Sequence, residues 1–117
     1  MNTNNFKENY SFEKRKNESS NIIEKYVDRI PIIVQKYYKS ELPDIDKCKY
    51  LVPKDMKLTQ LTFVIRKRIK LDSTQTIFVT INNGLIPGNR SLSEIYSEYK
   101  DEDGFLYIVY TNENTFG

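Results

Sequence analysis

Strand-like and helix-like segments alternate along the chain in an order that few folds share. Runs rich in β-branched and aromatic residues predict four strands, at residues 29–37, 49–52, 77–81 and 105–110. Apolar residues at helical spacing predict two helices among them, at 58–69 and 91–99. The order β-β-α-β-α-β within about ninety residues predicts an α+β domain of the β-grasp type, with a four-stranded mixed sheet around one principal helix.

Further helical signals precede this core. Ser11 suits an N-cap, and side chains from Phe12 to Tyr26 place an apolar face at helical spacing. A short helical turn is expected around Phe6. The chain is therefore expected to form one domain in three parts: an N-terminal helical extension (1–27), a β-grasp core (28–111) and a flexible C-terminal tail (112–117).

Prolines and glycines mark the ends and turns of these segments. Pro31 has no amide N–H to donate to a sheet ladder, so it favours an edge position for the first strand, where a guest strand could pair. The second strand is closed by Pro53, and we expect the two strands to pair as a hairpin. Clusters at 82–84 and 87–89 predict turns.

Composition removes most catalytic chemistry. The chain has no histidine, which excludes Ser-His-Asp and Cys-His nucleophile pairs. The single cysteine, Cys48, excludes an internal disulfide and the usual zinc clusters, and a lone thiol suits the reducing cytoplasm. We expect neither an enzyme nor a cofactor, and no apolar stretch approaches the ~20 residues that a membrane span needs.

Charge is distributed unevenly along the chain. Residues 1–70 carry 16 Lys and Arg against 9 Asp and Glu, or +7, whereas residues 71–117 carry 2 against 7, or −5. One face should therefore suit acidic peptides, anionic lipid or nucleic acid, and electrostatics alone does not choose among them. Nucleic acid is the least expected partner, because the acidic half would repel the phosphate backbone.

The sequence closes on a polar segment followed by Phe116 and Gly117. Glycine has no Cβ, so its backbone can thread a narrow channel and bring its carboxylate to another enzyme's nucleophile. Ubiquitin-like modifiers present a terminal glycine in this way. A terminal glycine alone is also compatible with a tail that has no function.

Five motifs together resemble the GABARAP and light-chain-three family of autophagy modifiers. They stand in the family order and at the family spacing, at residues 12–15, 26–34, 49–53, 63–69 and 101–107. The resemblance covers residues from about Phe6 to Gly117. It implies a ubiquitin-like β-grasp fold with two additional N-terminal helices.

The resemblance also implies a mode of action. Activating and conjugating enzymes would pass Gly117 through thioesters to the amine of phosphatidylethanolamine, and a cysteine protease would process or delipidate the protein. The expected location is the cytoplasm and, after lipidation, the autophagosomal membrane. A monomer is expected. An unconjugated ubiquitin-like binding module, acting as a trafficking or cytoskeletal tether, is the alternative.

The family binds short acidic segments with an aromatic-x-x-aliphatic core, which add a strand beside the second strand. By matched positions, the resemblance implies a first pocket of Glu18, Ile22, Pro31, Ile33, Lys49, Leu51 and Phe105. It implies a second pocket of Tyr50, Val52, Pro53, Met56, Leu61, Val64 and Arg68. Acidic flanks would be attracted by Arg29, Lys47, Lys49, Lys67 and Arg68. A possible second docking surface comprises Ile77, Phe78 and Val79.

Some of these residues have a plainer interpretation. Judged by periodicity alone, Ile33, Val52 and Leu61 belong to the core, and the basic end of the helix at 58–69 is a solvated face. The family favours an aromatic residue where Leu61 stands, so the second pocket is expected to differ in shape. The turn at 87–90 also departs from the family pattern.

Overall fold

The computed structural model describes residues 5–113 and contains helices and strands, as predicted. The helices are α1 (Phe6–Asn9), α2 (Phe12–Lys25), α3 (Leu58–Arg68) and α4 (Leu92–Tyr99). The strands are β1 (Arg29–Lys36), β2 (Lys49–Pro53), β3 (Phe78–Ile81), β4 (Gly84–Leu85) and β5 (Leu106–Thr111). Every helix and strand expected from the sequence is present, with ends that agree within one or two residues.

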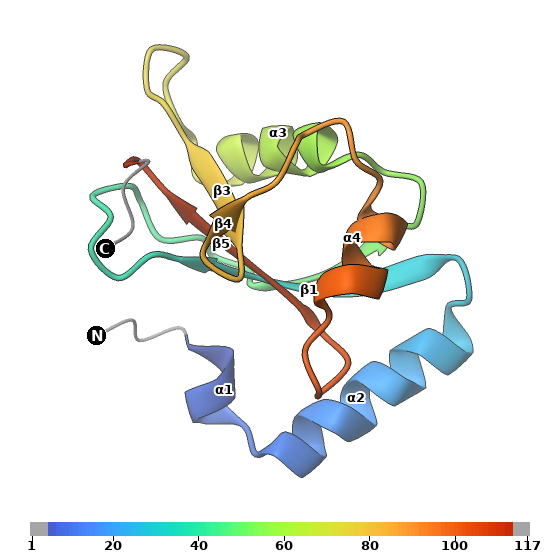
Figure 1. Cartoon of the computed structure of the whole chain (residues 1–117). Coiled ribbons are helices and arrows are strands. Elements are labelled where there is room, and N and C mark those ends of the chain that lie inside the picture. Colours follow the sequence, from blue (N-terminus) through green and yellow to red (C-terminus); the bar gives the residue numbers. More distant parts are fainter. Residues whose placement is uncertain (1–4, 114–117) are drawn as a thin grey trace.

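The strands form one mixed sheet in the order β2-β1-β5-β3-β4. β1 pairs with β2 antiparallel, as the predicted hairpin, and with β5 parallel. β3 pairs antiparallel with both β5 and β4. In Figure 1, α3 lies above the sheet, and α1 and α2 lie below it. The fold is an α+β ubiquitin-like sheet with two additional N-terminal helices.

The sheet has five strands, so the prediction of four was wrong. The fifth, β4, contains only Gly84 and Leu85 and is too short to show an alternating pattern. Asn82 and Asn83 have φ angles of 51° and 65°, which turn the chain back directly after β3. Asparagine tolerates this left-handed backbone better than most residues do, and two such residues in succession form a tight hairpin turn.

The prediction that β1 lies at an edge was also wrong, because β1 is flanked by β2 and β5. Pairing with β5 begins at Ile32, opposite Leu106, one residue after Pro31. On the other side, the Val34 amide bonds to the Cys48 carbonyl, so the even-numbered residues of β1 bond to β2. Pro31 therefore occupies a position where no ladder needs its amide.

The main core lies between the sheet and the helices α3 and α4. The predicted apolar stripe on α3 faces it, since Leu58, Leu61, Ile65 and Ile69 are at most 4% exposed. A second, smaller core lies on the side of α1 and contains Phe6, Ile33 and Phe105. The rings of Phe6 and Phe105 meet edge to face with centroids 5.2 Å apart.

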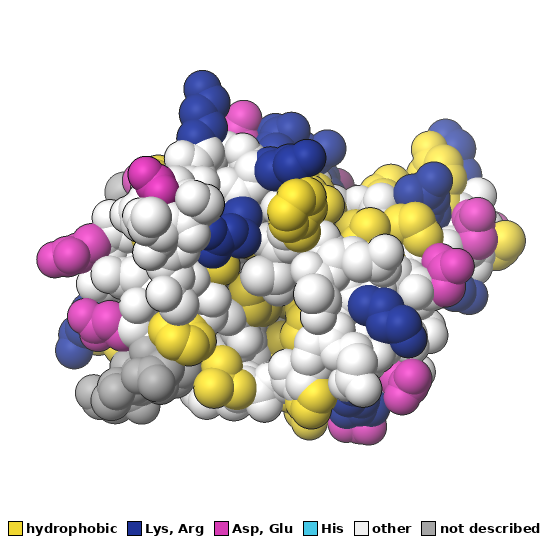
Figure 2. Space-filling model, turned by 90° about the horizontal axis from the view of Figure 1, so that it is seen from above, with side chains coloured by type: hydrophobic (Ala, Val, Ile, Leu, Met, Phe, Trp, Pro, Cys, Tyr) yellow, Lys and Arg dark blue, Asp and Glu magenta, His cyan; other side chains and the backbone are white. Residues whose placement is uncertain are grey.

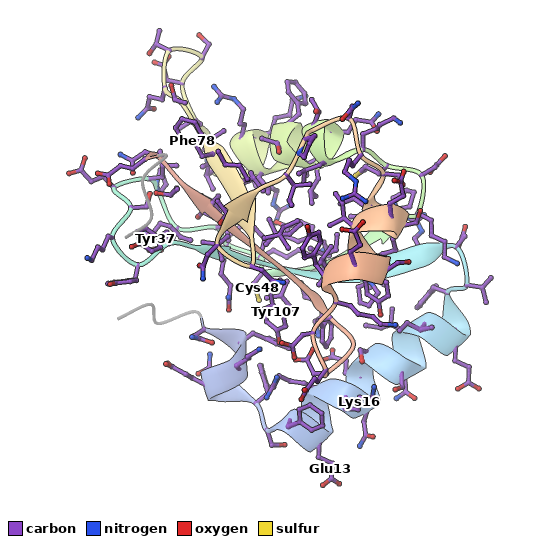
Figure 3. All side chains as sticks on the ribbon, in the orientation of Figure 1. Glu13, Lys16, Tyr37, Cys48, Phe78 and Tyr107 are labelled. Atoms are coloured by element: carbon purple, nitrogen blue, oxygen red, sulfur yellow. The ribbon has the colours of Figure 1, made fainter. Side chains whose placement is uncertain are left out.

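A buried polar cluster attaches α2 to the loop before β5. The Arg15 guanidinium pairs with the Asp103 carboxylate over 2.5 Å, and the Tyr107 hydroxyl donates to the same carboxylate oxygen. Burial and this hydrogen bond raise the pKa of Tyr107. Ser19 donates to the Asp103 carbonyl, and Gly104, with φ +88°, lies so close that a Cβ would come within 2.3 Å of the Ser19 hydroxyl. Tyr107 projects from the sheet toward α1 and α2 (Figure 3).

Candidate functional site

β2 forms one edge of the sheet, and its outward-facing backbone groups pair with no other strand among residues 5–113. The register pairs Val34 with Cys48, and the Val34 amide donates to the Cys48 carbonyl over 2.7 Å. Bonded and non-bonded positions alternate in an antiparallel pair, so Lys49 and Leu51 direct their backbone groups away from β1. This edge can therefore accept a further strand.

Side chains of β2 alternate between two faces of the sheet. Tyr50 and Val52 are buried in the main core with α3. Lys49 lies on the opposite face, where it contacts Glu18 of α2, and alternation places Leu51 on that face too. The two predicted pockets thus lie on opposite faces of one edge strand.

A groove of about 600 Å³ lies between α2 and β2. Three of the residues predicted for the first pocket line it: Glu18, Ile22 and Lys49. Pro31, Ile33 and Phe105 are buried, and Ile33 and Phe105 belong to the smaller core with Phe6. Because Ile22 packs against that core, the groove lies next to it.

Sequence reasoning missed other residues that line this groove. They are Tyr10, Lys14, Asn17, Asn21, Lys25 and Tyr26. Most belong to α2 and recur every three or four positions, so they form one polar face of that helix. The periodicity was visible in the sequence, but a polar helical face is most often simply solvated, and it gave no sign that β2 lies opposite.

Lys49 is already paired within the chain. Its ammonium group contacts the Glu18 carboxylate across the groove, and both side chains are more than one-third exposed. Arg29 is also engaged, since its guanidinium donates to the Leu51 carbonyl over 3.4 Å. That carbonyl is one of the outward-facing acceptors of β2.

On the α3 face, Arg68 is paired with Asp46 at 3.1 Å. Lys47 lies over the ring of Tyr50, 5.3 Å from its centroid. The Tyr50 hydroxyl is buried and has no direct hydrogen-bond partner among residues 5–113. Burial raises the pKa of Tyr50, and the neighbouring Arg68 guanidinium opposes this rise.

The residues predicted for the second pocket divide by exposure. Tyr50, Val52 and Leu61 are buried, whereas Pro53, Met56 and Val64 are half-buried. Next to them on α3, Lys67 lies 4.8 Å from the centroid of the exposed Phe63 ring. Figure 2 shows basic side chains beside exposed hydrophobic ones on the face that carries α3.

The predicted second docking surface lies away from β2. Phe78 and Val79 belong to β3, which is separated from β2 by β1 and β5 in the sheet order. Val79 is buried, whereas Ile77 and Phe78 are half-buried. Figure 3 places Phe78 near the connection that leads into β3. Gly117 lies outside the described residues.

Among residues 5–113, no helix is long and apolar enough to cross a membrane. No group of three or more metal-binding side chains comes together in the same range.

Comparison with known proteins identifies the family. Residues 14–117 match the family model described as "Autophagy protein Atg8 ubiquitin like". Autophagy-related protein 8e of Arabidopsis thaliana is 56% identical over 112 residues, covering 96% of this chain and 92% of that protein. Autophagy-related protein 8 of Schizosaccharomyces pombe is also 56% identical over 112 residues, with 96% and 93% covered.

A solved structure agrees with the sequence match. The crystal structure of Trypanosoma brucei ATG8 superposes with a TM-score of 0.89 at 42% identity, and 97% of each chain is covered. The edge strand β2, the additional helices α1 and α2 and these relationships lead to one conclusion. The chain belongs to the Atg8 family of ubiquitin-like autophagy proteins.

Proposed function

We propose that this protein is a ubiquitin-like modifier that is attached through Gly117 to phosphatidylethanolamine on autophagosomal membranes and recruits partners there through β2. The family match extends to Gly117 and supports the attachment. One observation supports the recruitment of partners. β2 is an edge strand with outward-facing backbone groups, and its side chains alternate between the two faces of the sheet.

The attachment needs no catalytic residue in this chain. A carboxylate is a poor electrophile, so an activating enzyme would first form a Gly117 acyl-adenylate and release pyrophosphate from a nucleoside triphosphate. An enzyme thiolate would displace the nucleotide, and a second thiolate, on a conjugating enzyme, would take the acyl group. The lipid amine would then attack the thioester carbonyl, so that a C–N bond forms, the C–S bond breaks and the amine loses a proton.

Strand addition explains the spacing of an aromatic-x-x-aliphatic motif. Residues three apart on a strand point to opposite faces. A guest strand beside β2 would direct its aromatic side chain to the groove under α2 and its aliphatic side chain toward Pro53, Met56 and Val64. Burying each such side chain contributes about 1.5–3 kcal/mol, which with the backbone bonds suits roughly micromolar affinity.

Acidic residues that flank the motif would replace the chain's own carboxylates as ion-pair partners of its basic side chains. Lys49 is held by Glu18 and Arg68 by Asp46, and all four side chains are more than one-third exposed. Exposed ion pairs contribute only about 0–1 kcal/mol, so replacing them is inexpensive. Arg29, Lys47 and Lys67 would add long-range attraction and salt sensitivity.

The remaining partners follow from the same role. We propose activating and conjugating enzymes, a processing or delipidating cysteine protease and cargo receptors with acidic motifs. The protein would act as a monomer, in the cytoplasm before lipidation and on the autophagosomal membrane afterwards. Phe78 and its neighbours would form any second docking surface.

Mass spectrometry of the C-terminal peptide from membranes of starved cells tests this function. We expect phosphatidylethanolamine on Gly117. Deleting Gly117 should abolish membrane attachment and leave peptide binding intact, whereas combining Lys49→Ala with Leu51→Ala should do the reverse. A uniformly free carboxylate, beside an active conjugation control, would instead indicate an unconjugated tether.

A further inference from the structure

Ser40 and Asn112 hold the chain one residue beyond the end of β5. The Ser40 hydroxyl donates to the Asn112 side-chain oxygen over 3.1 Å and accepts from the Asn112 backbone N–H at 3.3 Å. The Glu41 amide donates to the same side-chain oxygen over 3.4 Å. These contacts join residues about seventy positions apart in the sequence. We call this arrangement the Ser40–Asn112 clasp.

The clasp is joined to the buried core of the domain. Ser40 is 8% exposed, and it lies in the connection between β1 and β2 that buries Leu42 and Ile45 in the main core. The Tyr110 hydroxyl donates to the Pro43 carbonyl over 2.7 Å, which ties the same connection to β5 a second time. Ser40 is therefore held in a defined position, from which it can hold Asn112.

The sheet does not need the clasp for its own pairing. The last ladder position of β5 is Thr111, which lies opposite Phe78 in β3. Asn112 comes after it, and the five residues from there to Gly117 span at most about 17 Å when extended. The clasp consequently sets the point from which the carboxylate of Gly117 can be presented.

We propose that Ser40 and Asn112 are positioning residues for acyl transfer from Gly117, because they set the place and direction in which the C-terminal tail leaves the domain. This inference rests on the proposed function. Acyl transfer requires the reacting carbonyl to be held within a narrow range of positions. If the residue at which the tail leaves the domain is not held in place, the rate of transfer falls. Neither residue touches the reacting atoms.

Ser40→Ala, Asn112→Ala and the double variant provide the test. The full-length protein, family activating and conjugating enzymes and phosphatidylethanolamine vesicles would be used to measure single-turnover transfer from the conjugating-enzyme thioester. We expect each single variant to transfer about threefold to tenfold more slowly, with the double variant no slower than either. Peptide binding at β2 should not change.

Asn112→Asp is the matched control. A carboxylate keeps the acceptor that Ser40 and Glu41 contact, so this variant should transfer at close to the wild-type rate. Amide hydrogen exchange at Asn112 should accelerate in Ser40→Ala, which reports the clasp without any conjugation. Equal transfer by all variants, additive losses, or an Asn112→Asp variant as slow as Asn112→Ala would overturn the clasp alone. No transfer by the wild type, with a working Atg8 control, would overturn the proposed function as well.

Discussion

Single acidic residues determine how available the basic side chains near β2 are to a binding partner. Lys49 is paired with Glu18, and Arg68 with Asp46, so neither cation is fully available to a partner. The sequence showed the cations but not their partners. Glu18 and Lys49 are thirty-one positions apart, and only the packing of α2 beside β2 brings them together.

Glu18→Gln should bind an acidic-flanked motif peptide more tightly than the wild type. Without its carboxylate, residue 18 no longer competes with the acidic flank of the peptide for Lys49. The exposed Glu18–Lys49 pair contributes about 0–1 kcal/mol, so its loss should raise the affinity by up to roughly fivefold. Fluorescence anisotropy at two salt concentrations would also show a steeper salt dependence. Glu13→Gln removes the same charge from the start of α2, where Glu13 points away from the body of the protein (Figure 3). Equal affinity gains in both variants would contradict competition at Lys49.

At the scale of elements, local patterns predicted what each segment becomes but not always its place in the sheet. The stripe on α3 and the N-cap Ser11, whose hydroxyl accepts from the Lys14 amide, depend on residues within a few positions of one another, so they could be predicted. Strand order depends on contacts distant in sequence. Pro31 was therefore assigned to an edge, although β2 is the edge strand and β1 lies inside the sheet.

Leu51→Pro should weaken peptide binding strongly while keeping the sheet. The amide of Leu51 points away from β1, so a proline removes only the donor that a guest strand would use. Leu51→Ala keeps this amide and loses only side-chain contact, so it serves as the control. Isothermal titration calorimetry should show at least roughly tenfold weaker binding for the proline variant than for the alanine variant. Equal binding by the two would mean that partners do not pair with β2 at this position.

At the scale of the whole molecule, the N-terminal extension is joined to the sheet by both apolar and polar contacts. Phe6 packs on Phe105, and the buried Arg15–Asp103 pair joins α2 to the loop before β5. The sequence placed helices in this extension but could not show that a buried ion pair attaches them. The attachment matters for binding, because α2 supplies one wall of the groove beside β2.

Asp103→Asn should therefore weaken both stability and binding. Asp103 is fully buried and its carboxylate accepts from Arg15, from the Tyr107 hydroxyl and from the Phe105 amide. Breaking a buried pair leaves Arg15 without its counter-charge and costs about 3–5 kcal/mol, measurable by urea unfolding. Peptide affinity should fall too, because α2 would no longer be held in one position against β2.

Asp101→Asn separates this effect from the loss of any nearby carboxylate. Asp101 pairs with Lys7 at 2.6 Å in a more exposed position, so its removal should cost only about 0–1 kcal/mol and leave affinity unchanged. If Asp103→Asn loses stability but binds peptide as the wild type does, the groove does not depend on how α2 is attached. If it loses neither, the buried pair does not hold the extension, and the apolar contacts of Phe6 are sufficient.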